Sequence, residues 1–310
     1  MTKLGFAGFA FGAGLWAQAP PDTPPKAGYS IFDGTMVDMS YPAIEQAAKD
    51  HAAILWPLGV IEEHGPALPL GTDIYQSYAR MKRVSELLKA DGIQSLVAPP
   101  MYWGMNEATN AFGGSFSIRP STLKAIIEDT FFSLRKDGFE NVYIITGHGD
   151  RIHNKTIVDA VEEARITTGI RGYVVMNGAL RDRLGLTGKE PFVLIQPEAP
   201  ATPAPPANTG GAAARPQQVD GHSGGGESGS MWYLFPNLVN ADVLKRLKPT
   251  NYGPDDLAEW RKGWSDARAK TPLGYFGDPA SADRNRAKQA FERDTASIAA
   301  TIKAHLQRKK

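Results

Sequence analysis

The chain has 310 residues, of which 42% are hydrophobic and 22% charged, a composition ordinary for a globular protein large enough to hold one α/β domain. Its net charge of +1 gives no electrostatic reason to expect a nucleic acid or an anionic membrane as partner. There is no cysteine, which excludes disulfides, thiolate metal ligands and a cysteine nucleophile, so His, Asp and Glu must hold any metal.

The N-terminus has the pattern of an export signal. Lys3 precedes an apolar run over residues 4–16 that is too short to span a bilayer, and Ala17-Gln18-Ala19 is typical of a cleavage site. We therefore predict a periplasmic or secreted protein; the alternative is a cytoplasmic protein with an apolar N-terminus. The predicted organisation is a signal peptide over 1–19, a Pro-rich extension over 20–37 and a main domain over 38–310.

Strand-like apolar runs then alternate with segments of helical periodicity. Tyr78, Met81, Val84 and Leu88 recur at helical spacing, with Asp73 as the expected N-cap. This alternation predicts an α/β fold with a mostly parallel sheet and helices on both faces. The expected strands span 53–60, 94–98, 141–146 and 172–176, and the expected helices 42–51, 74–90, 121–136, 153–167, 241–247, 255–269 and 283–307.

Residues 196–220 interrupt this pattern. The segment contains six prolines and almost no large apolar side chain, so it cannot bury a core. We predict a surface insertion within the domain. Because it ends two residues before His222, the alternative is a lid over a site.

Two polar clusters follow predicted strands. Glu62, His64 and Asp73 come after the strand at 53–60, and His148 and Asp150 after the strand at 141–146. In parallel sheets, ligands bind beyond the carboxyl ends of the strands. Two imidazoles and three carboxylates suit Zn²⁺, Mn²⁺ or Fe²⁺ and exceed what one structural zinc needs. The pattern favours a catalytic site for one or two metal ions.

The first cluster also belongs to a longer motif. Val60-Ile61-Glu62-Glu63-His64-Gly65-Pro66, continued by Leu68-Pro69-Leu70 and Thr72-Asp73, resembles the signature of the creatininase (creatinine amidohydrolase) family. The resemblance extends over about residues 38–305, outside the insertion. Further matches occur in the family's order at Tyr102-Trp103-Gly104, Phe112-Gly113-Gly114-Ser115, Gly147-His148-Gly149-Asp150, His222-x-Gly224-x-x-Glu227 and Gly274-Tyr275-Phe276-Gly277-Asp278-Pro279.

The resemblance implies a three-layer α/β/α domain, a homo-oligomer that is often a hexamer, and two divalent metal ions, Zn or Mn with Fe as a further option. A metal-activated hydroxide would attack an amide carbonyl. His222 would shuttle the proton, with Glu227 orienting it or supporting the site from outside. The implied ligands are Glu62 and His148 for one metal, His64 and Asp150 for the other, and Asp73 for both.

Departures from the family pattern bear on the substrate. Asp150 has a shorter arm than the Glu of creatininase, and Arg151 replaces an Asn. Asn106 stands where creatininase has a substrate-contacting Ser, and with Gly149 and Trp103 it forms the expected substrate-binding set. We therefore predict a metal-dependent amidohydrolase that acts on a small amide, lactam or peptide-like substrate. The alternatives are a lactonase or ester hydrolase on the same site and an exported metal- or solute-binding protein without catalysis.

Other polar residues are expected to be structural. His51, His153 and His305 are interpreted as solvated histidines, and Glu63 as a side chain that faces solvent rather than a metal. Neither nucleic acid nor membrane is expected as a partner of the mature protein.

Overall fold

A computed structural model describes residues 29–197 and 219–308. The chain divides into two units, Met1–Ser30 and Ile31–Lys310, and the fold given below is that of the second unit. The predicted signal peptide, the first part of the Pro-rich extension and nearly all of the insertion at 196–220 lie outside the described residues. These three assignments stay predictions.

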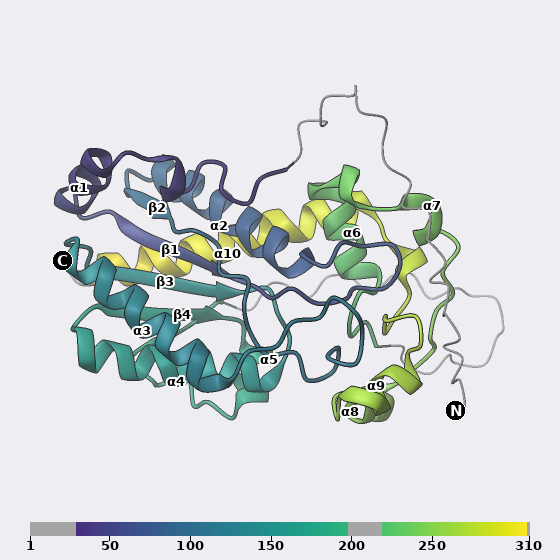
Figure 1. Cartoon of the computed structure of the whole chain (residues 1–310). Helices are drawn as coiled ribbons and strands as arrows, with labels where there is room; N and C mark the ends of the chain where they lie inside the picture. The colour runs from purple at the N-terminus through teal and green to yellow at the C-terminus, as the bar shows by residue number, and fades with distance from the viewer. Residues whose placement is uncertain (1–28, 198–218, 309–310) are drawn as a thin grey trace, which may run out of the picture. The chain divides into compact units, whose positions relative to one another are not determined.

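The centre of the fold is a parallel sheet with the strand order β2-β1-β3-β4-β5 (Figure 1). β1 is paired in register with β3 from Ile54 opposite Val142 to Leu58 opposite Thr146. The mostly parallel sheet predicted from the sequence is therefore confirmed. The strands are β1 (Ala53–Leu58), β2 (Ser95–Val97), β3 (Asn141–Thr146), β4 (Arg171–Met176) and β5 (Val193–Ile195).

Helices cover both faces of the sheet. In β1, Ile54 and Trp56 face one core with α3 (Pro120–Lys136) and α4 (Arg151–Thr168). Leu55, between them in sequence, faces a second core with α2 (Thr72–Ala90) and α10 (Arg284–Gln307). Figure 1 shows the teal α3 and α4 across the sheet from the yellow α10. Because successive strand residues point to opposite faces, continuous apolar strands produce the expected three-layer fold.

Several elements differ in extent from the prediction. The helix expected over 255–269 is two helices, α8 (Pro254–Trp260) and α9 (Trp264–Lys270), separated at Gly263, whose φ is +84°. Only glycine adopts such a φ readily, and a Cβ there would overlap the Glu107 carbonyl. The remaining described elements are η1 (Met36–Asp38), α1 (Tyr41–Lys49), α5 (Gly178–Leu184), α6 (Gly225–Leu234), η2 (Pro236–Leu238), α7 (Ala241–Leu244) and η3 (Pro279–Ser281).

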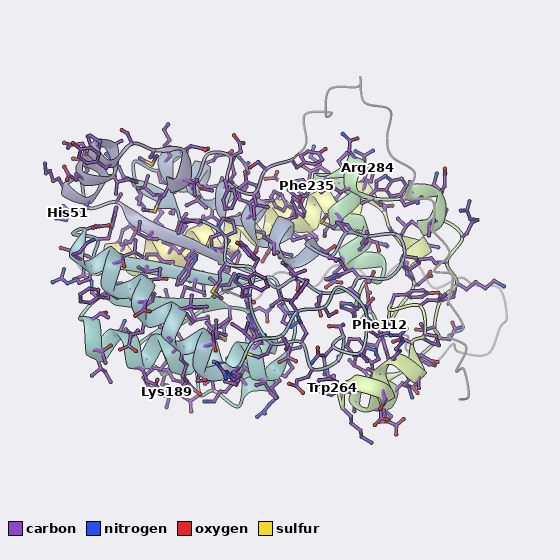
Figure 2. All side chains as sticks on the ribbon, in the orientation of Figure 1. His51, Phe112, Lys189, Phe235, Trp264 and Arg284 are labelled. Carbon is purple, nitrogen blue, oxygen red and sulfur yellow. The ribbon has the colours of Figure 1, made fainter. Side chains whose placement is uncertain are left out.

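The two ends of the sheet differ in character. At the amino end, His51 precedes β1, is exposed and lies 3.8 Å from Glu140, as expected for a solvated histidine. At the carboxyl end, loops and short helices extend beyond the strands, and Figure 2 shows Phe112 and Trp264 on this side, away from His51. The predicted metal ligands lie at this end. Over the two described ranges, no helix has both the length and the apolarity required to cross a membrane.

Candidate metal centre

Close backbone packing positions the first turn of α2 against the ends of β1 and β3. Gly147 donates its N–H to the Leu58 carbonyl at 2.8 Å, and a Cβ at Gly147 would overlap the Asp73 carbonyl. A Cβ at Gly59 would lie 2.8 Å from the Ile74 nitrogen. The two glycines thus let the turn that carries Asp73 approach both strands. The sequence predicted Asp73 as the N-cap of α2, but Asp73 is the second residue of the helix and Gly71 is its N-cap.

One group of donors consists of Glu62, Asp73 and His148. All three side chains are buried, and one ligand atom from each lies within 4.8 Å of the others. His148 Nδ1 lies 2.9 Å from Glu62 Oε1 and 3.0 Å from Asp73 Oδ2. Two side chains from loops and one from the first turn of α2 thus converge on one small volume.

A second group shares Asp73 and adds His64 and Glu227. His64 Nε2 lies 3.4 Å from Asp73 Oδ1 and 3.8 Å from Glu227 Oε2. Glu227 is in the first turn of α6 and accepts the Ser223 N–H at 2.6 Å. Asp73 therefore presents Oδ2 to the first group and Oδ1 to the second, the arrangement expected of a carboxylate that bridges two ions.

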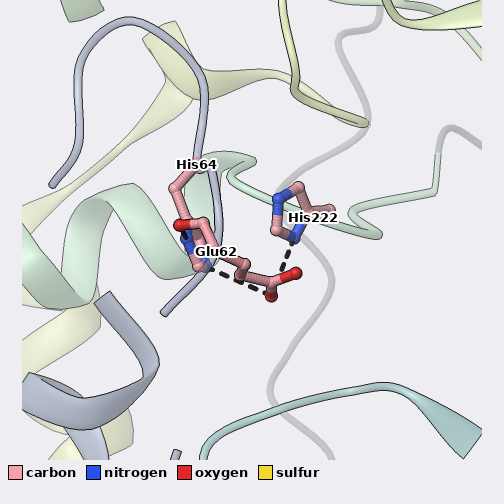
Figure 3. A group of neighbouring side chains, drawn as sticks. All are labelled: Glu62, His64 and His222. Carbon is pink, nitrogen blue, oxygen red and sulfur yellow. Dashed lines mark hydrogen bonds and ion pairs between the residues drawn. The ribbon is translucent and has the colours of Figure 1, made fainter. Parts of the chain in front are cut away.

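His222 forms a third such group with Glu62 and His64. Its Nδ1 lies 3.9 Å from Glu62 Oε1, and its ring centroid is 4.5 Å from that of His64. Figure 3 shows Glu62 between the two imidazoles, with an interaction drawn to each. The orientation of the His222 ring is fixed by a hydrogen bond, since Nε2 lies 2.8 Å from the Glu63 carbonyl oxygen.

The hydrogen bonds of the histidines decide whether a cation fits. His64 Nδ1 lies 3.1 Å from the Glu62 carbonyl, and His148 Nε2 lies 2.9 Å from the Met105 carbonyl. A carbonyl only accepts, so these nitrogens carry the hydrogen in the neutral ring. The opposite nitrogens, His64 Nε2 and His148 Nδ1, are buried, form no hydrogen bond and face carboxylates. Asp73 Oδ2 is also buried and forms no hydrogen bond. Lone pairs directed at carboxylates suit a bound divalent cation, and backbone support of this kind is usual for metal-binding histidines.

The pKa values of the site residues also favour a bound cation. Burial alone would raise the pKa of Asp73, but His64 and His148 hold it far below its ordinary value. Burial alone would lower the pKa of His148, but Glu62 and Asp73 raise it well above its ordinary value. The buried carboxylates therefore favour positive charge between them, which a protonated imidazole or a bound cation would supply.

Asp150 lies elsewhere than predicted. Oδ1 accepts the His153 N–H at 2.8 Å, capping α4, and Oδ2 accepts the Glu107 N–H at 3.1 Å. No group of metal-type donors among the described residues includes Asp150. Glu227, predicted to assist His222, instead lies with His64 and Asp73. The geometry thus favours Glu227 over Asp150 as a ligand.

The three expected substrate-binding residues are dispersed. Gly149 is exposed and lines the cavity beside the donors. Asn106 is fully buried and donates through Nδ2 to the Phe116 carbonyl at 2.5 Å, which braces a loop. Trp103 lines a separate groove with Trp56 and is packed edge-to-face on Phe116. Its position does not favour contact with a substrate at the metal centre, and that role stays a prediction.

Two residues expected at the surface are buried. Glu63 is 7% exposed, accepts the Gly65 N–H at 2.9 Å and places Oε1 3.5 Å from His222 Nε2. Its solvent-facing assignment was wrong, because the chain turns at Gly65 and folds the side chain inward. His153 has no exposure, and its ring centroid lies 5.2 Å from that of His148. Neither orientation is visible in the local sequence.

Thr109 also supports the site, a role that its position in the sequence does not reveal. Its Oγ1 donates to Glu62 Oε2 at 2.5 Å, and the residue is only 1% exposed. This bond orients Glu62 so that Oε1 faces His148. A single Thr in a loop has no pattern that marks it, so only the fold reveals the contact.

A cavity of 430 Å³ opens beside the donors. Its walls include Glu62, His148, His222 and Glu227, and the indole of Trp260 lies 5.4 Å from the His222 ring. This volume is in the range of small-molecule sites. The cavity places a small ligand against the donor groups and against His222.

Comparison with known proteins identifies the family of the chain. The model of the creatininase family, described as creatinine amidohydrolase, matches residues 37–302. A creatinine amidohydrolase of Pseudomonas putida is 24% identical over 288 residues, which cover 88% of this chain and 96% of the relative. A mycofactocin precursor peptide peptidase of Mycobacterium ulcerans (strain Agy99) is 24% identical over 245 residues, 77% of this chain and 80% of the relative.

The fold has solved counterparts. A creatininase variant described as Zn-Zn type superimposes with a TM-score of 0.63 at 20% identity, covering 90% of this chain and 99% of that one. At this identity the likeness supports the fold alone. Because the family model spans most of the sequence, the chain belongs to the creatininase family and is a hydrolase that acts on carbon–nitrogen bonds.

Proposed function

We propose that this amidohydrolase uses two divalent cations. Glu62, Asp73 and His148 would hold one, and His64, Asp73 and Glu227 the other. The observation that carries the proposal is the position of Asp73, whose two oxygens face different histidines that lack hydrogen-bond partners on that side. Nitrogen and oxygen donors of this kind suit Zn²⁺ or Mn²⁺, and a solved relative is described as Zn-Zn type.

Bound cations would polarise a substrate carbonyl and lower the pKa of a bound water toward about 7. The protein's own residues would then handle the proton. Burial alone would lower the pKa of His222, but Glu62, Glu63 and Glu227 raise it to about 10. Cations at Glu62 and Glu227 would offset part of that increase. His222 can therefore carry the proton that the leaving nitrogen needs, from a position on the cavity wall.

His222 is held in the orientation that this role requires. Nε2 lies against the Glu63 carbonyl, so Nδ1 faces Glu62 and the donor groups. Ser223 follows with a positive φ of 48° and donates through Oγ to the His64 carbonyl at 2.5 Å. These contacts join the loop that carries His222 to the loop that carries His64. Proton transfer and metal binding would thus share one rigid support.

The substrate proposed from the cavity is a small amide, lactam or peptide-like molecule. Two named relatives, a creatinine amidohydrolase and a peptide peptidase, differ in substrate size but share cleavage of a carbon–nitrogen bond. The cavity admits a small molecule or a short peptide end. The family assignment supports the bond that is cleaved, and the particular substrate needs a screen.

The test combines metal content with turnover. We expect purified protein to contain two equivalents of Zn or Mn by elemental analysis, and matched lactam and lactone substrates to show preference for the lactam. Dialysis against a strong chelator should abolish turnover, and added Zn²⁺ or Mn²⁺ should restore it. Full activity after chelation would refute the role of the cations.

Asp73→Asn and Asp91→Asn make a matched pair on one helix. Asp73 is shared by both donor groups, whereas Asp91 caps the far end of α2 and pairs with Lys303 at the surface. We expect Asp73→Asn to lose most of its bound metal and its turnover, while Asp91→Asn retains both. Equal metal content in the two variants would contradict the proposed bridge.

Export and homo-oligomerisation, both predicted from the sequence, remain proposals. Mass analysis of the protein recovered from the periplasm or medium tests cleavage after Ala19. Sedimentation of the purified chain tests the oligomeric state, with a monomer as the outcome that would refute it.

A further inference from the structure

Four cationic side chains line the same cavity as the metal donors: Arg151, Arg183, Arg261 and Lys262. They come from separate parts of the chain. Arg151 begins α4, Arg183 lies in α5, and Arg261 and Lys262 follow α8. The same cavity is also lined by the imidazoles of His148 and His222 and by the carboxylates of Glu62, Glu107, Asp150 and Glu227.

Three of these cations have no acidic partner. Lys262 lies 3.6 Å from Glu259, but across the described part of the chain no carboxylate oxygen comes within 4.0 Å of Arg151, Arg183 or Arg261. Arg181, two residues before Arg183 on the same helix, is ion-paired with Asp182 at 2.6 Å. Arg181 thus carries the same charge on the same helix but has an acidic partner, which makes it the matched comparison for Arg183.

Arg183 is the most constrained of the three. Its Nε is buried and has no hydrogen-bond partner, and its backbone carbonyl accepts from Arg151 Nε at 3.4 Å. Burial lowers the pKa of Arg183, the charge of Arg261 lowers it further, and Asp150 opposes both. Asp150 already accepts two backbone N–H groups. Three neighbouring guanidinium groups repel one another, and Arg183 Nε has a hydrogen to donate, so a bound anion would stabilise this part of the cavity.

We propose that Arg183, assisted by Arg151 and Arg261, binds a carboxylate of the substrate, so that the enzyme selects anionic amides such as N-acyl amino acids. The inference rests on the proposed amidohydrolase function and names its substrate class. A guanidinium group presents parallel N–H donors that match the two oxygens of a carboxylate. The amide carbonyl would then lie toward Glu62, His148 and His222 on the wall of the same cavity.

The apolar part of the cavity fits the rest of such a substrate. Trp260, Ala108 and Ile152 contribute carbon surface to the lining of the cavity. An acyl chain or an amino acid side chain can pack there, while the carboxylate stays at the arginines. Polar contacts at both ends and apolar contacts between them are the usual composition of a small-molecule site.

The first experiment measures anion binding without catalysis. Protein is freed of metal by dialysis against 1,10-phenanthroline, the chelator is removed, and thermal unfolding is followed with added glutarate at constant ionic strength. We expect glutarate to raise the Tm of the wild type and of Arg181→Met, but not that of Arg183→Met. Since no metal is present, this result is independent of whether the proposed metal chemistry is correct.

The second experiment measures selection during turnover of the metal-loaded enzyme. N-acetylglycine, N-acetyl-β-alanine and N-acetyl-4-aminobutyrate are compared with the matching N-acetyl amino alcohols, which keep the scissile amide and lose the charge. For the best chain length we expect kcat/KM to favour the carboxylate by about 10- to 100-fold. Arg183→Met should abolish that preference, and Arg181→Met should retain it.

The outcomes separate the inference from the proposed function. Glutarate stabilisation that is equal in Arg183→Met and the wild type, or absent from both, overturns the carboxylate site. A stronger stabilisation by phosphate than by glutarate overturns the choice of a carboxylate. Anion binding that depends on Arg183, in a protein with no amide turnover, would uphold the site and refute the amidohydrolase proposal. If Arg183→Met does not fold, Arg151→Met, at an exposed position, takes its place with the same expectations.

Discussion

At the scale of single residues, the metal centre depends on side chains that hold the proposed ligands without being ligands. Thr109 is the clearest case, because its hydroxyl donates to one oxygen of Glu62 while the other oxygen faces His148. The neutral tautomers of His64 and His148 depend in the same way on backbone carbonyls. Such outer contacts fix ligand orientation, and losing one commonly weakens metal binding.

Thr109→Val removes the hydroxyl and keeps the shape. We expect the dissociation constant for the metal held by Glu62 to rise by about 10- to 100-fold, because Glu62 loses the bond that orients it. Thr109→Ser keeps the hydroxyl and serves as the control, with near-normal affinity. Competitive titration against a fluorescent chelator measures both. Equal affinities for the two variants would show that the Thr109 contact does not support the ligand.

Gly147→Ala tests the close approach of α2. The added Cβ would overlap the Asp73 carbonyl, so the first turn of the helix must move away from β3. We expect loss of bound metal and a lower Tm. Gly149→Ala, two residues away, meets nothing within 4 Å and should keep its metal content. Elemental analysis of both proteins makes the comparison, and retained metal in Gly147→Ala would contradict this account.

The structure brings four of the five predicted ligands close together and directs the fifth, Asp150, elsewhere. Glu62, His64, Asp73 and His148 converge as their position after parallel strands predicts. Asp150 follows the same strand as His148, yet its carboxylate caps α4. Glu227 reaches His64 from a distant helix. Local spacing reports which polar residues are neighbours in a loop, but not which direction a side chain takes when a helix begins beside it.

At the scale of elements, α3 shows how one face of a helix stabilises the sheet. Leu123, Ile127 and Phe131 are fully buried on that face. A Cβ at Gly172 in β4 would overlap the Phe131 ring, so the helix and strand meet closely. Phe132, the next residue, is 63% exposed. The stability contributed by α3 should therefore depend on which of two adjacent aromatic residues is removed.

Phe131→Ala and Phe132→Ala test this asymmetry. We expect Phe131→Ala to reduce the free energy of unfolding by about 3–5 kcal/mol through lost burial and a cavity. Phe132→Ala should change it by less than about 0.5 kcal/mol. Denaturant unfolding followed by circular dichroism measures both values. Similar losses for the two variants would mean that α3 is packed differently from this description.

The boundaries of an element were predictable where its apolar pattern was clear. They were not predictable where tertiary contacts determine them. β3 was predicted over its exact span of 141–146, whereas α5 and β5 are too short to produce a recognisable period. The break at Gly263 arises because the chain passes over the Glu107 carbonyl, and that contact joins residues more than 150 positions apart. A continuous helical pattern over 255–269 gives no sign of it.

At the scale of the whole molecule, metal binding at the candidate centre should add to the stability of the fold. Glu62, Asp73 and Glu227 place carboxylates in one partly closed site, and Glu62 and Asp73 are 2% exposed. Burying such charges costs free energy unless positive charge balances them. The donors come from the ends of β1 and β3 and from α2 and α6, so a cation that joins them holds several elements together.

Metal addition should therefore raise the Tm of the whole domain. At a free Zn²⁺ concentration 100 times the dissociation constant, one site contributes about 2.7 kcal/mol. For a domain of this size that corresponds to a rise of roughly 5 °C. Mg²⁺ prefers oxygen ligands in octahedral geometry and should raise the Tm less at equal concentration. Scanning calorimetry of metal-free protein measures the response, with Asp73→Asn as the variant expected to lose it. An unchanged Tm in the wild type, or the same rise in Asp73→Asn, would show that the cations do not bind where the carboxylates converge.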